Sequence, residues 1–356
     1  MDVNRLIAAM LQKHGTASDL HFKVGRPPMV RVARKLRETE YPKLQAPHTV
    51  AIAKALLNEK QSADFDKGKA VDASYHIKGV SRFRVNAFHQ KGTAEIILRV
   101  IPANIPKIEE LNLPEVLKKV AMEERGLVLM TGSAGSGKST SLASMINYAN
   151  SNSKCHIITV EDPIEFVYND IQSSVEQIEV GVDVPNFQRA LRAALRQDPD
   201  IILVGEMRDI ETIDIAIKAA ETGHLVFSTL HTTDATKTIN RIIDTFPPYQ
   251  QQQVRFQLGA NLKAVISQRL LPRADGKGLI PAVEVLICTL TVQDQIINPD
   301  KTVEIRDTIA RGREHYHMQT IDQHLTELYK SGVVTIETAL EAATNPSDFQ
   351  RALTFE

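Results

Sequence analysis

Apolar residues follow one pattern in the first hundred positions of this chain and another after residue 110. Residues 2–14 carry apolar side chains at helical spacing, and a second helix is expected near residues 50–57. Runs in which apolar and polar residues alternate predict four strands, at residues 20–24, 29–32, 81–88 and 95–100. Gly92, between the last two runs, favours a hairpin. We therefore expect a mixed α+β domain over residues 1–100.

Residues 101–110 are predicted to form a linker, because two prolines stand in an extended stretch there. Strands and helices then alternate, which is typical of a mostly parallel sheet. Nearly continuous apolar runs predict strands buried on both faces, at residues 127–130, 156–160, 201–204 and 225–229. A helical C-terminal region is expected from about residue 248, with helices at residues 250–271, 320–330 and 336–343. The second domain is thus predicted to span residues 111–356.

Polar, ionisable residues follow each of the four buried runs. Ligands of parallel sheets bind beyond the carboxyl ends of the strands, so these segments are expected to meet at one edge. They are residues 132–140, 161–165, 205–208 and 230–233. A sheet with only a structural role has no need of this arrangement.

The first of these segments matches the phosphate-loop pattern G-x-x-x-x-G-K-[ST] at every fixed position. Glycines let backbone N–H groups surround phosphate oxygens, and the helix that follows points its positive end at the same anion. Lys138 can reach the β- and γ-phosphates, and the Ser139 hydroxyl can bind Mg²⁺. The predicted nucleotide-binding residues are Ser133, Ala134, Gly135, Ser136, Gly137, Lys138, Ser139 and Thr140. A chance glycine turn is the alternative, but the strand before the loop and the helix after it argue against one.

Two carboxylates are candidates for the chemistry. Glu206 follows the third buried run at the tip of the strand, where it could orient and deprotonate an attacking water; Gly205 stands where P-loop ATPases commonly have an aspartate. Glu165 could position water or metal, so Glu165 and Glu206 are predicted Mg²⁺ contacts, directly or through water. The alternatives are a solvated surface residue for Glu206 and a capping residue for Glu165.

His224 and His231 bracket the last buried run. We expect His231 to sense the γ-phosphate, and His224 is a second candidate for the same role. The alternative for each is a neutral hydrogen-bonding residue, which is what a histidine at a strand end most often is. Metal binding by the pair is not expected, since no third ligand has suitable spacing.

Composition narrows the function classes. Hydrophobic residues make up 43% of the 356 residues, which is ordinary for a globular protein. The formal net charge of −1, and the lack of an evident basic and aromatic groove, argue against a nucleic-acid partner. Cys155 and Cys288 form no CxxC pair, which excludes a cysteine-based zinc site. With no signal peptide and no apolar run near the roughly 20 residues of a membrane span, we expect a cytoplasmic protein that could dock on a membrane-embedded partner.

Four motifs together resemble the Walker A, Asp, Walker B and His boxes of the secretion ATPase superfamily. They are residues 132–140, 158–166, 195–209 and 222–232. Within that superfamily the chain is most similar to the PilT-like type IV pilus retraction ATPases. The resemblance implies a PAS-like N-terminal domain and a RecA-like P-loop ATPase domain with a helical C-terminal extension. It also implies that Arg84 and Arg99 clamp the phosphates of ATP, as planar guanidinium groups do well.

The resemblance further implies a homohexameric ring that uses ATP and Mg²⁺ to drive pilus retraction and twitching motility. The expected partners are an inner-membrane platform protein and a second retraction-type ATPase. Residues 304–313 depart from the helix that retraction ATPases usually carry there, so an accessory pilus motor stays open beside an extension or type II secretion ATPase. A nucleic-acid translocase and a nucleotide-sensing scaffold without catalysis are the alternatives from other classes.

Overall fold

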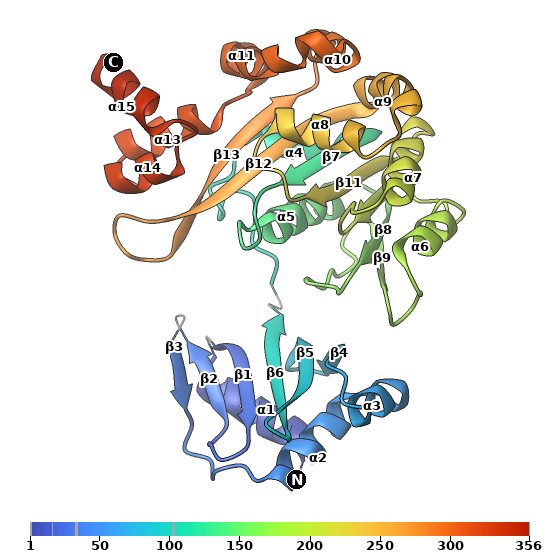
Figure 1. Cartoon of the computed structure of the whole chain (residues 1–356), viewed down its shortest axis with the longest axis vertical. Helices are drawn as coiled ribbons and strands as arrows, with labels where there is room; N and C mark the ends of the chain where they lie inside the picture. Colours follow the sequence, from blue (N-terminus) through green and yellow to red (C-terminus); the bar gives the residue numbers. More distant parts are fainter. Residues whose placement is uncertain (1, 16, 33–34, 102–103, 356) are drawn as a thin grey trace. The chain divides into compact units, whose positions relative to one another are not determined.

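The computed structural model describes residues 2–15, 17–32, 35–101 and 104–355. The chain divides into two compact units, residues 1–104 with Glu165–Val167, and residues 105–164 with residues 168–356 (Figure 1). No helix among the described residues is long and apolar enough to cross a membrane. Residues 102–103 of the predicted linker lie outside the described part of the chain.

The first unit is built on an antiparallel sheet with the strand order β3-β2-β1-β6-β5-β4. Its elements are α1 (Val3–Lys13), β1 (Ala17–Lys23), β2 (Met29–Val32), β3 (Lys35–Glu38), α2 (Ala46–Leu56), α3 (Glu59–Asp66), β4 (Val71–Ile77), β5 (Ser81–Gln90) and β6 (Thr93–Ile101). The hairpin expected at Gly92 is confirmed: Lys91 and Gly92 have φ of 51° and 73°, and β5 pairs with β6 on either side of them. Two residues with positive φ give the turn whose twist matches that of the strands.

Alternation along β5 and β6 buries one face of this sheet. Phe83 and Val85 on β5, and Ile96 and Leu98 on β6, are fully buried and belong to the same core as Ile7 of α1. The intervening positions, which include Arg84 and Arg99, lie on the other face and are partly or fully exposed. The period of two residues thus decides which side chains of the hairpin are available for function.

The second unit contains a seven-stranded sheet with the strand order β13-β12-β7-β11-β10-β8-β9. The strands are β7 (Gly126–Thr131), β8 (His156–Glu161), β9 (Ser174–Glu179), β10 (Ile201–Val204), β11 (Leu225–Leu230), β12 (Leu262–Pro272) and β13 (Leu279–Ile287). All neighbours are parallel except β12 and β13. Every residue of β7, β10 and β11 is buried, as expected for strands covered on both faces.

Helices surround this sheet (Figure 1). They are α4 (Val116–Ala121), α5 (Lys138–Asn152), α6 (Phe187–Ala194), α7 (Ile210–Glu221), α8 (Ala235–Asp244), α9 (Pro248–Asn261), α10 (Leu290–Ile297), the 3₁₀ helix η1 (Pro299–Glu304), α11 (Ile305–Arg311), α12 (Arg313–Tyr316), α13 (Ile321–Lys330), α14 (Ile336–Ala342) and α15 (Pro346–Phe355). Asp209 and Asp234 cap α7 and α8 by accepting hydrogen bonds from backbone N–H groups of their first turns. Both capping residues come directly after loops at the carboxyl edge of the sheet, so the caps also fix where these loops end.

One predicted helix is wrong. Residues 250–271 do not form a single helix, because α9 ends at Asn261 and β12 begins at Leu262. Residues 262–271 include Val265 and Ile266, whose branched side chains suit a strand, and β12 pairs with β7 on one side and with β13 on the other. The region after residue 248 therefore adds two strands to the sheet before its helices continue.

Candidate functional site

The phosphate loop joins β7 to α5. Gly132, Gly135 and Gly137 have φ of 146°, 77° and 86°, which L-residues with side chains rarely adopt. A Cβ on Gly132 would lie 2.4 Å from the backbone oxygen of Gln268, and one on Gly137 would lie 2.7 Å from Gln268 Nε2. The backbone of β12 therefore requires glycine at position 132, and the positive φ favours glycine at position 137.

The loop has the features of an anion cradle. Lys138, at the first position of α5, is buried, and its Nζ donates to the backbone oxygens of Gly132 at 2.7 Å and Ser133 at 3.0 Å. The hydroxyl of Ser136 is also buried, and it has no hydrogen-bond partner among the described residues. A buried polar atom of this kind normally finds a partner, and a phosphate oxygen would supply one. Together with the N-terminus of α5, these groups fit a phosphate.

Glu206 and His231 meet beside this loop. His231 Nε2 lies 3.0 Å from Glu206 Oε1, and Arg208 Nη2 lies 2.6 Å from Glu206 Oε2. His231 Nδ1 lies 3.5 Å from Lys138 Nζ. An ammonium group can only donate, so Nδ1 accepts, and Nε2 carries the proton that it donates to Glu206. The predicted lysine, histidine and glutamate are therefore brought together in one chain of contacts, and the hydrogen bond to Glu206 raises the pKa of Arg208.

Neighbouring strands hold this chain of contacts in place. Because β10 and β11 are parallel neighbours, their carboxyl ends deliver Glu206 and His231 to the same edge. The hydroxyl of Thr229 donates to the backbone oxygen of Gly205 at 2.6 Å, and the N–H of Met207 donates back to the oxygen of Thr229 at 3.2 Å. The two loops are thus tied together on either side of Glu206.

Gly205, which stands where an aspartate is common, has a structural reason to be small. Its N–H donates to the backbone oxygen of Val160 at 2.8 Å. A Cβ there would lie 3.2 Å from that oxygen and 3.3 Å from Cα of Glu161. The end of β10 therefore packs closely against the end of β8. Glu161, which belongs to the predicted polar segment 161–165 but was not among the candidate catalytic residues, is buried at that edge and accepts a hydrogen bond from Thr159 Oγ1 at 2.7 Å.

The structure does not bring all predicted residues together. His224 precedes β11, whereas His231 follows it, so a strand of six residues separates them. At about 3.3 Å per residue, this places His224 at the opposite edge of the sheet from the phosphate loop. Its Nδ1 lies 2.9 Å from the backbone oxygen of Ala219. The expectation that both histidines face the same motifs is therefore wrong for His224. We leave His224 out of the proposed site.

The predicted metal contacts are divided between the two units. Ser139 is half-buried in the first turn of α5, next to Lys138. Glu165 is exposed and groups with the first unit, and its contact with the metal stays a prediction. No group of three or more His, Cys, Asp or Glu side chains within the described ranges is arranged to hold a metal ion.

Arg84 and Arg99 are paired neighbours on the exposed face of the first unit. They lie opposite each other in the register of β5 and β6. Like charges at such positions repel, and each has a carboxylate nearby: Arg84 Nε lies 3.8 Å from Asp72 Oδ1, and Arg99 Nε lies 3.2 Å from Asp19 Oδ1. Asp19 is buried and also pairs with Arg31, and 69% of the Arg99 side chain is exposed.

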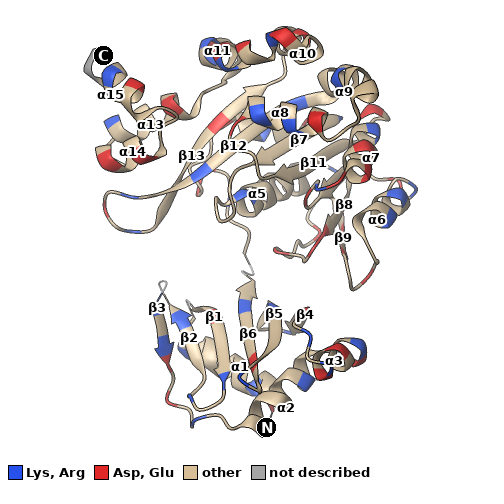
Figure 2. Cartoon of the chain, viewed as in Figure 1, with Lys and Arg blue, Asp and Glu red and all other residues tan. Residues whose placement is uncertain are grey.

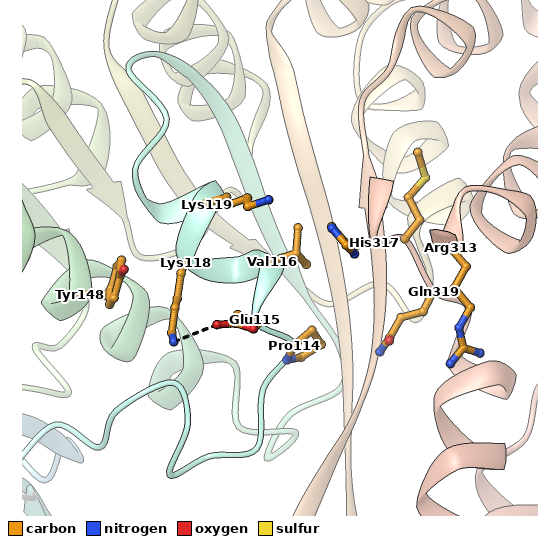
Figure 3. Close-up of a pocket in the computed structure, with 10 residues that line it drawn as sticks. Pro114, Glu115, Val116, Lys118, Lys119, Tyr148, Arg313, His317 and Gln319 are labelled. Atoms are coloured by element: carbon orange, nitrogen blue, oxygen red, sulfur yellow. Dashed lines mark ion pairs between the residues drawn. The ribbon is translucent and has the colours of Figure 1, made fainter. Parts of the chain in front are cut away.

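Two pockets of the second unit differ in their relation to the site. One, of about 410 Å³, adjoins the outside of the phosphate loop and is lined by residues 133–136, by Leu270, Leu271 and Pro272 of β12, and by α14. The other, of about 540 Å³, lies between α4 and the segment that follows α12 (Figure 3). In that pocket Lys118 Nζ is 3.5 Å from Glu115 Oε1, as Figure 3 marks. The second pocket contains no residue of the phosphate loop.

Comparison with known proteins extends the resemblance to the whole chain. A sequence profile of the family described as "Type II/IV secretion system protein" matches residues 2–354. The chain is 46% identical over 349 residues to the type IV pilus retractation ATPase PilT of Pseudomonas aeruginosa, covering 98% of this chain and 100% of that protein. It is 41% identical over 350 residues to the type IV pilus ATPase PilU of the same organism, covering 98% of this chain and 91% of that protein.

Solved structures agree with these relatives. The fold matches the crystal structure of the pilus retraction motor PilT with bound ADP at a TM-score of 0.89. That match has 43% sequence identity and covers 99% of both chains. The fold class and the resemblance drawn from the four motifs are confirmed.

Proposed function

The chain belongs to the family of type II/IV secretion system proteins, and we propose that it is an ATP-hydrolysing motor that powers type IV pilus retraction and twitching motility. One observation carries the proposal. Lys138, His231 and Glu206 meet at a phosphate loop, in a chain that matches a retraction ATPase along its whole length. The loop supplies a place for the triphosphate, and Glu206 supplies a carboxylate beside it.

Each residue has a step that its geometry suits. Lys138 and the loop N–H groups hold the β- and γ-phosphates and neutralise charge that develops during transfer. Glu206 orients the attacking water and accepts its proton. His231 keeps Glu206 in place through a hydrogen bond from Nε2. It also lies next to Lys138, so that a γ-phosphate bound to Lys138 would lie close to the imidazole. Mg²⁺, held by Ser139 and reached by Glu206 and Glu165 directly or through water, would neutralise phosphate charge.

We also propose an oligomeric state, a cellular location and partners for this protein. We infer a cytoplasmic homohexamer at the inner membrane, in which Arg84 and Arg99 of the first unit clamp the phosphates. A platform protein of the pilus machine and a second retraction-type ATPase are the proposed partners. The proposed domain limits are residues 1–100, a linker at residues 101–110, and residues 111–356.

A second candidate function is that of an accessory pilus motor. The identity of 41% with PilU is only slightly lower than that with PilT, and residues 304–313 run from the end of η1 through the short helix α11 to the start of α12. An extension or type II secretion ATPase is the next candidate. A nucleic-acid translocase has less support, because basic and acidic residues are interspersed over both units (Figure 2).

Deleting the gene and counting surface pili tests the direction of action. Retraction predicts cells with an excess of pili that do not retract, and extension predicts bald cells. If the protein is an accessory motor, the deletion strain should have pili that still retract, but only against a lower load than in the wild type. DNA-stimulated ATP turnover by the purified protein would support the translocase instead.

A further inference from the structure

Gln268 of β12 lies against the phosphate loop, although it belongs to none of the four motifs. Strand β12 is the parallel neighbour of β7, the strand that leads into the loop, and Ser267 is in register with Thr131. The next residue, Gln268, is buried, with 2% of its surface exposed. A buried amide must have its donors and acceptor satisfied, so its partners indicate what it holds.

Both ends of the amide contact the loop and the helix that follows it. Gln268 Nε2 donates to the backbone oxygen of Ser136 at 2.7 Å. Gln268 Oε1 accepts from the hydroxyl of Ser141, in the first turn of α5, at 2.8 Å. One side chain therefore links the tip of the loop to the helix whose N-terminus faces the anion.

The contact with Ser136 controls the direction of a backbone donor. In a trans peptide the C=O and the following N–H point in opposite directions. Because Gln268 holds the oxygen of Ser136 toward β12, the N–H of Gly137 points away from β12 and is available to an anion. The lack of a Cβ on Gly137 leaves room for this contact, since a Cβ there would lie 2.7 Å from Nε2.

We propose that Gln268 is a positioning residue for ATP: it orients the Ser136–Gly137 peptide so that the loop can bind the β- and γ-phosphates. The inference rests on the function proposed above. It assigns a role in nucleotide binding to a strand that carries no catalytic residue. Gln268 does not contact the phosphates itself and acts through the loop.

The test is the affinity of the purified full-length protein for ATP and ADP, measured by calorimetric titration. Gln268→Met keeps the shape of the side chain but removes both hydrogen bonds. We expect it to raise Kd for both nucleotides about tenfold, since each bond contributes a factor of a few. Gln268→Glu keeps the acceptor for Ser141 but loses the donor to Ser136, so it should weaken binding at least as much. Ser141→Ala leaves the bond to Ser136 and should raise Kd less than threefold.

Gln295→Met is the matched control. Gln295 is a second buried glutamine, it lies on α10, and it donates to Thr308 Oγ1 at 2.8 Å. We expect this control to lower the melting temperature to a similar extent and to leave Kd unchanged. Wild-type affinity in a folded Gln268→Met or Gln268→Glu protein would overturn the proposal, as would an equal loss in Gln295→Met. If the wild-type protein itself failed to bind ATP, the function proposed above would fall as well.

Discussion

His231 Nε2 lies 3.0 Å from Glu206 Oε1, although 25 positions separate the two residues in the sequence. The parallel pairing of β10 with β11 creates this contact, because it brings both strand ends to the edge that carries the phosphate loop. The contact fixes the proton of the imidazole on Nε2 and one oxygen of the carboxylate toward it. Glu206 is therefore oriented before any substrate binds, which is how an active site lowers the cost of reaction.

Replacing His231 should affect turnover more than binding. We expect His231→Ala to lower kcat for ATP hydrolysis by about 10- to 100-fold, because a hydrogen bond to a charged group contributes about 1.5–3 kcal/mol. KM should change less, since Lys138 and the loop remain. The measurement is steady-state ATP hydrolysis at saturating Mg²⁺.

His156→Ala provides the matched control for that experiment. His156 begins β8 at the opposite edge of the sheet, and its Nε2 lies 2.7 Å from Glu176 Oε2. The control thus removes a histidine–carboxylate pair without touching the loop. Equal losses in the two variants would mean that the contact with Glu206 has no special role.

Glu284 should make stability depend on pH. This buried residue of β13 accepts from the N–H of Ala235 at 2.8 Å, and burial raises its pKa from 4.5 to about 7. Between these values the folded chain keeps a proton that the unfolded chain has lost, so the contribution of Glu284 to stability falls as pH rises from about 4.5 to about 7. The loss is about 3 kcal/mol at most.

Glu284→Gln isolates this effect, since the amide stays neutral at every pH and keeps the acceptor. We expect its melting temperature to match that of the wild type near pH 5 and to exceed it at pH 8. His324 has a pKa lowered to about 4 by burial and contributes with the opposite sign, so only the difference between variant and wild type is informative. A difference that does not grow with pH would contradict the account.

The paired arginines of the first unit should be needed for turnover. We expect Arg84→Ala and Arg99→Ala to lower kcat at least about tenfold if they clamp the phosphates. Arg99→Lys keeps a charge beside Asp19 but loses the planar fork, so it should preserve stability and still lose most of the turnover. Arg37→Ala, an exposed arginine on β3, is the control. Unchanged kcat in all three test variants would remove the clamp from the proposal.

The sequence predicted those elements of the fold that are encoded in short stretches of the chain. It did not predict elements that depend on pairing between distant segments. The phosphate loop and the buried strands of the parallel sheet are encoded in short stretches, so their positions were predicted well. Strand β12 was not, because residues 250–271 read as one continuous helical pattern, and only pairing with β7 and β13 makes the second half a strand. The polar edge strand β9 gave no apolar run at all.

The residues of the site were also predicted where their position along the chain was informative by itself. Glu206 and His231 lie just after strands, and Lys138 follows the loop that leaves β7, so the rule for parallel sheets brought them to one edge. His224 lay just before a strand, and the same rule should have placed it at the other edge. Gln268 could not be found from the sequence, because its importance comes from a contact across 132 positions with Ser136.

The most direct test of the account is ATP binding and hydrolysis by Glu206→Gln, with Lys138→Ala beside it. The amide keeps the size of the carboxylate and still accepts from His231, but it cannot take a proton. We expect this variant to bind ATP as tightly as the wild type and to hydrolyse it at least about 100-fold more slowly, and Lys138→Ala to lose binding. Hydrolysis by Glu206→Gln at a near-normal rate would contradict the assignment of Glu206 as the base in this site.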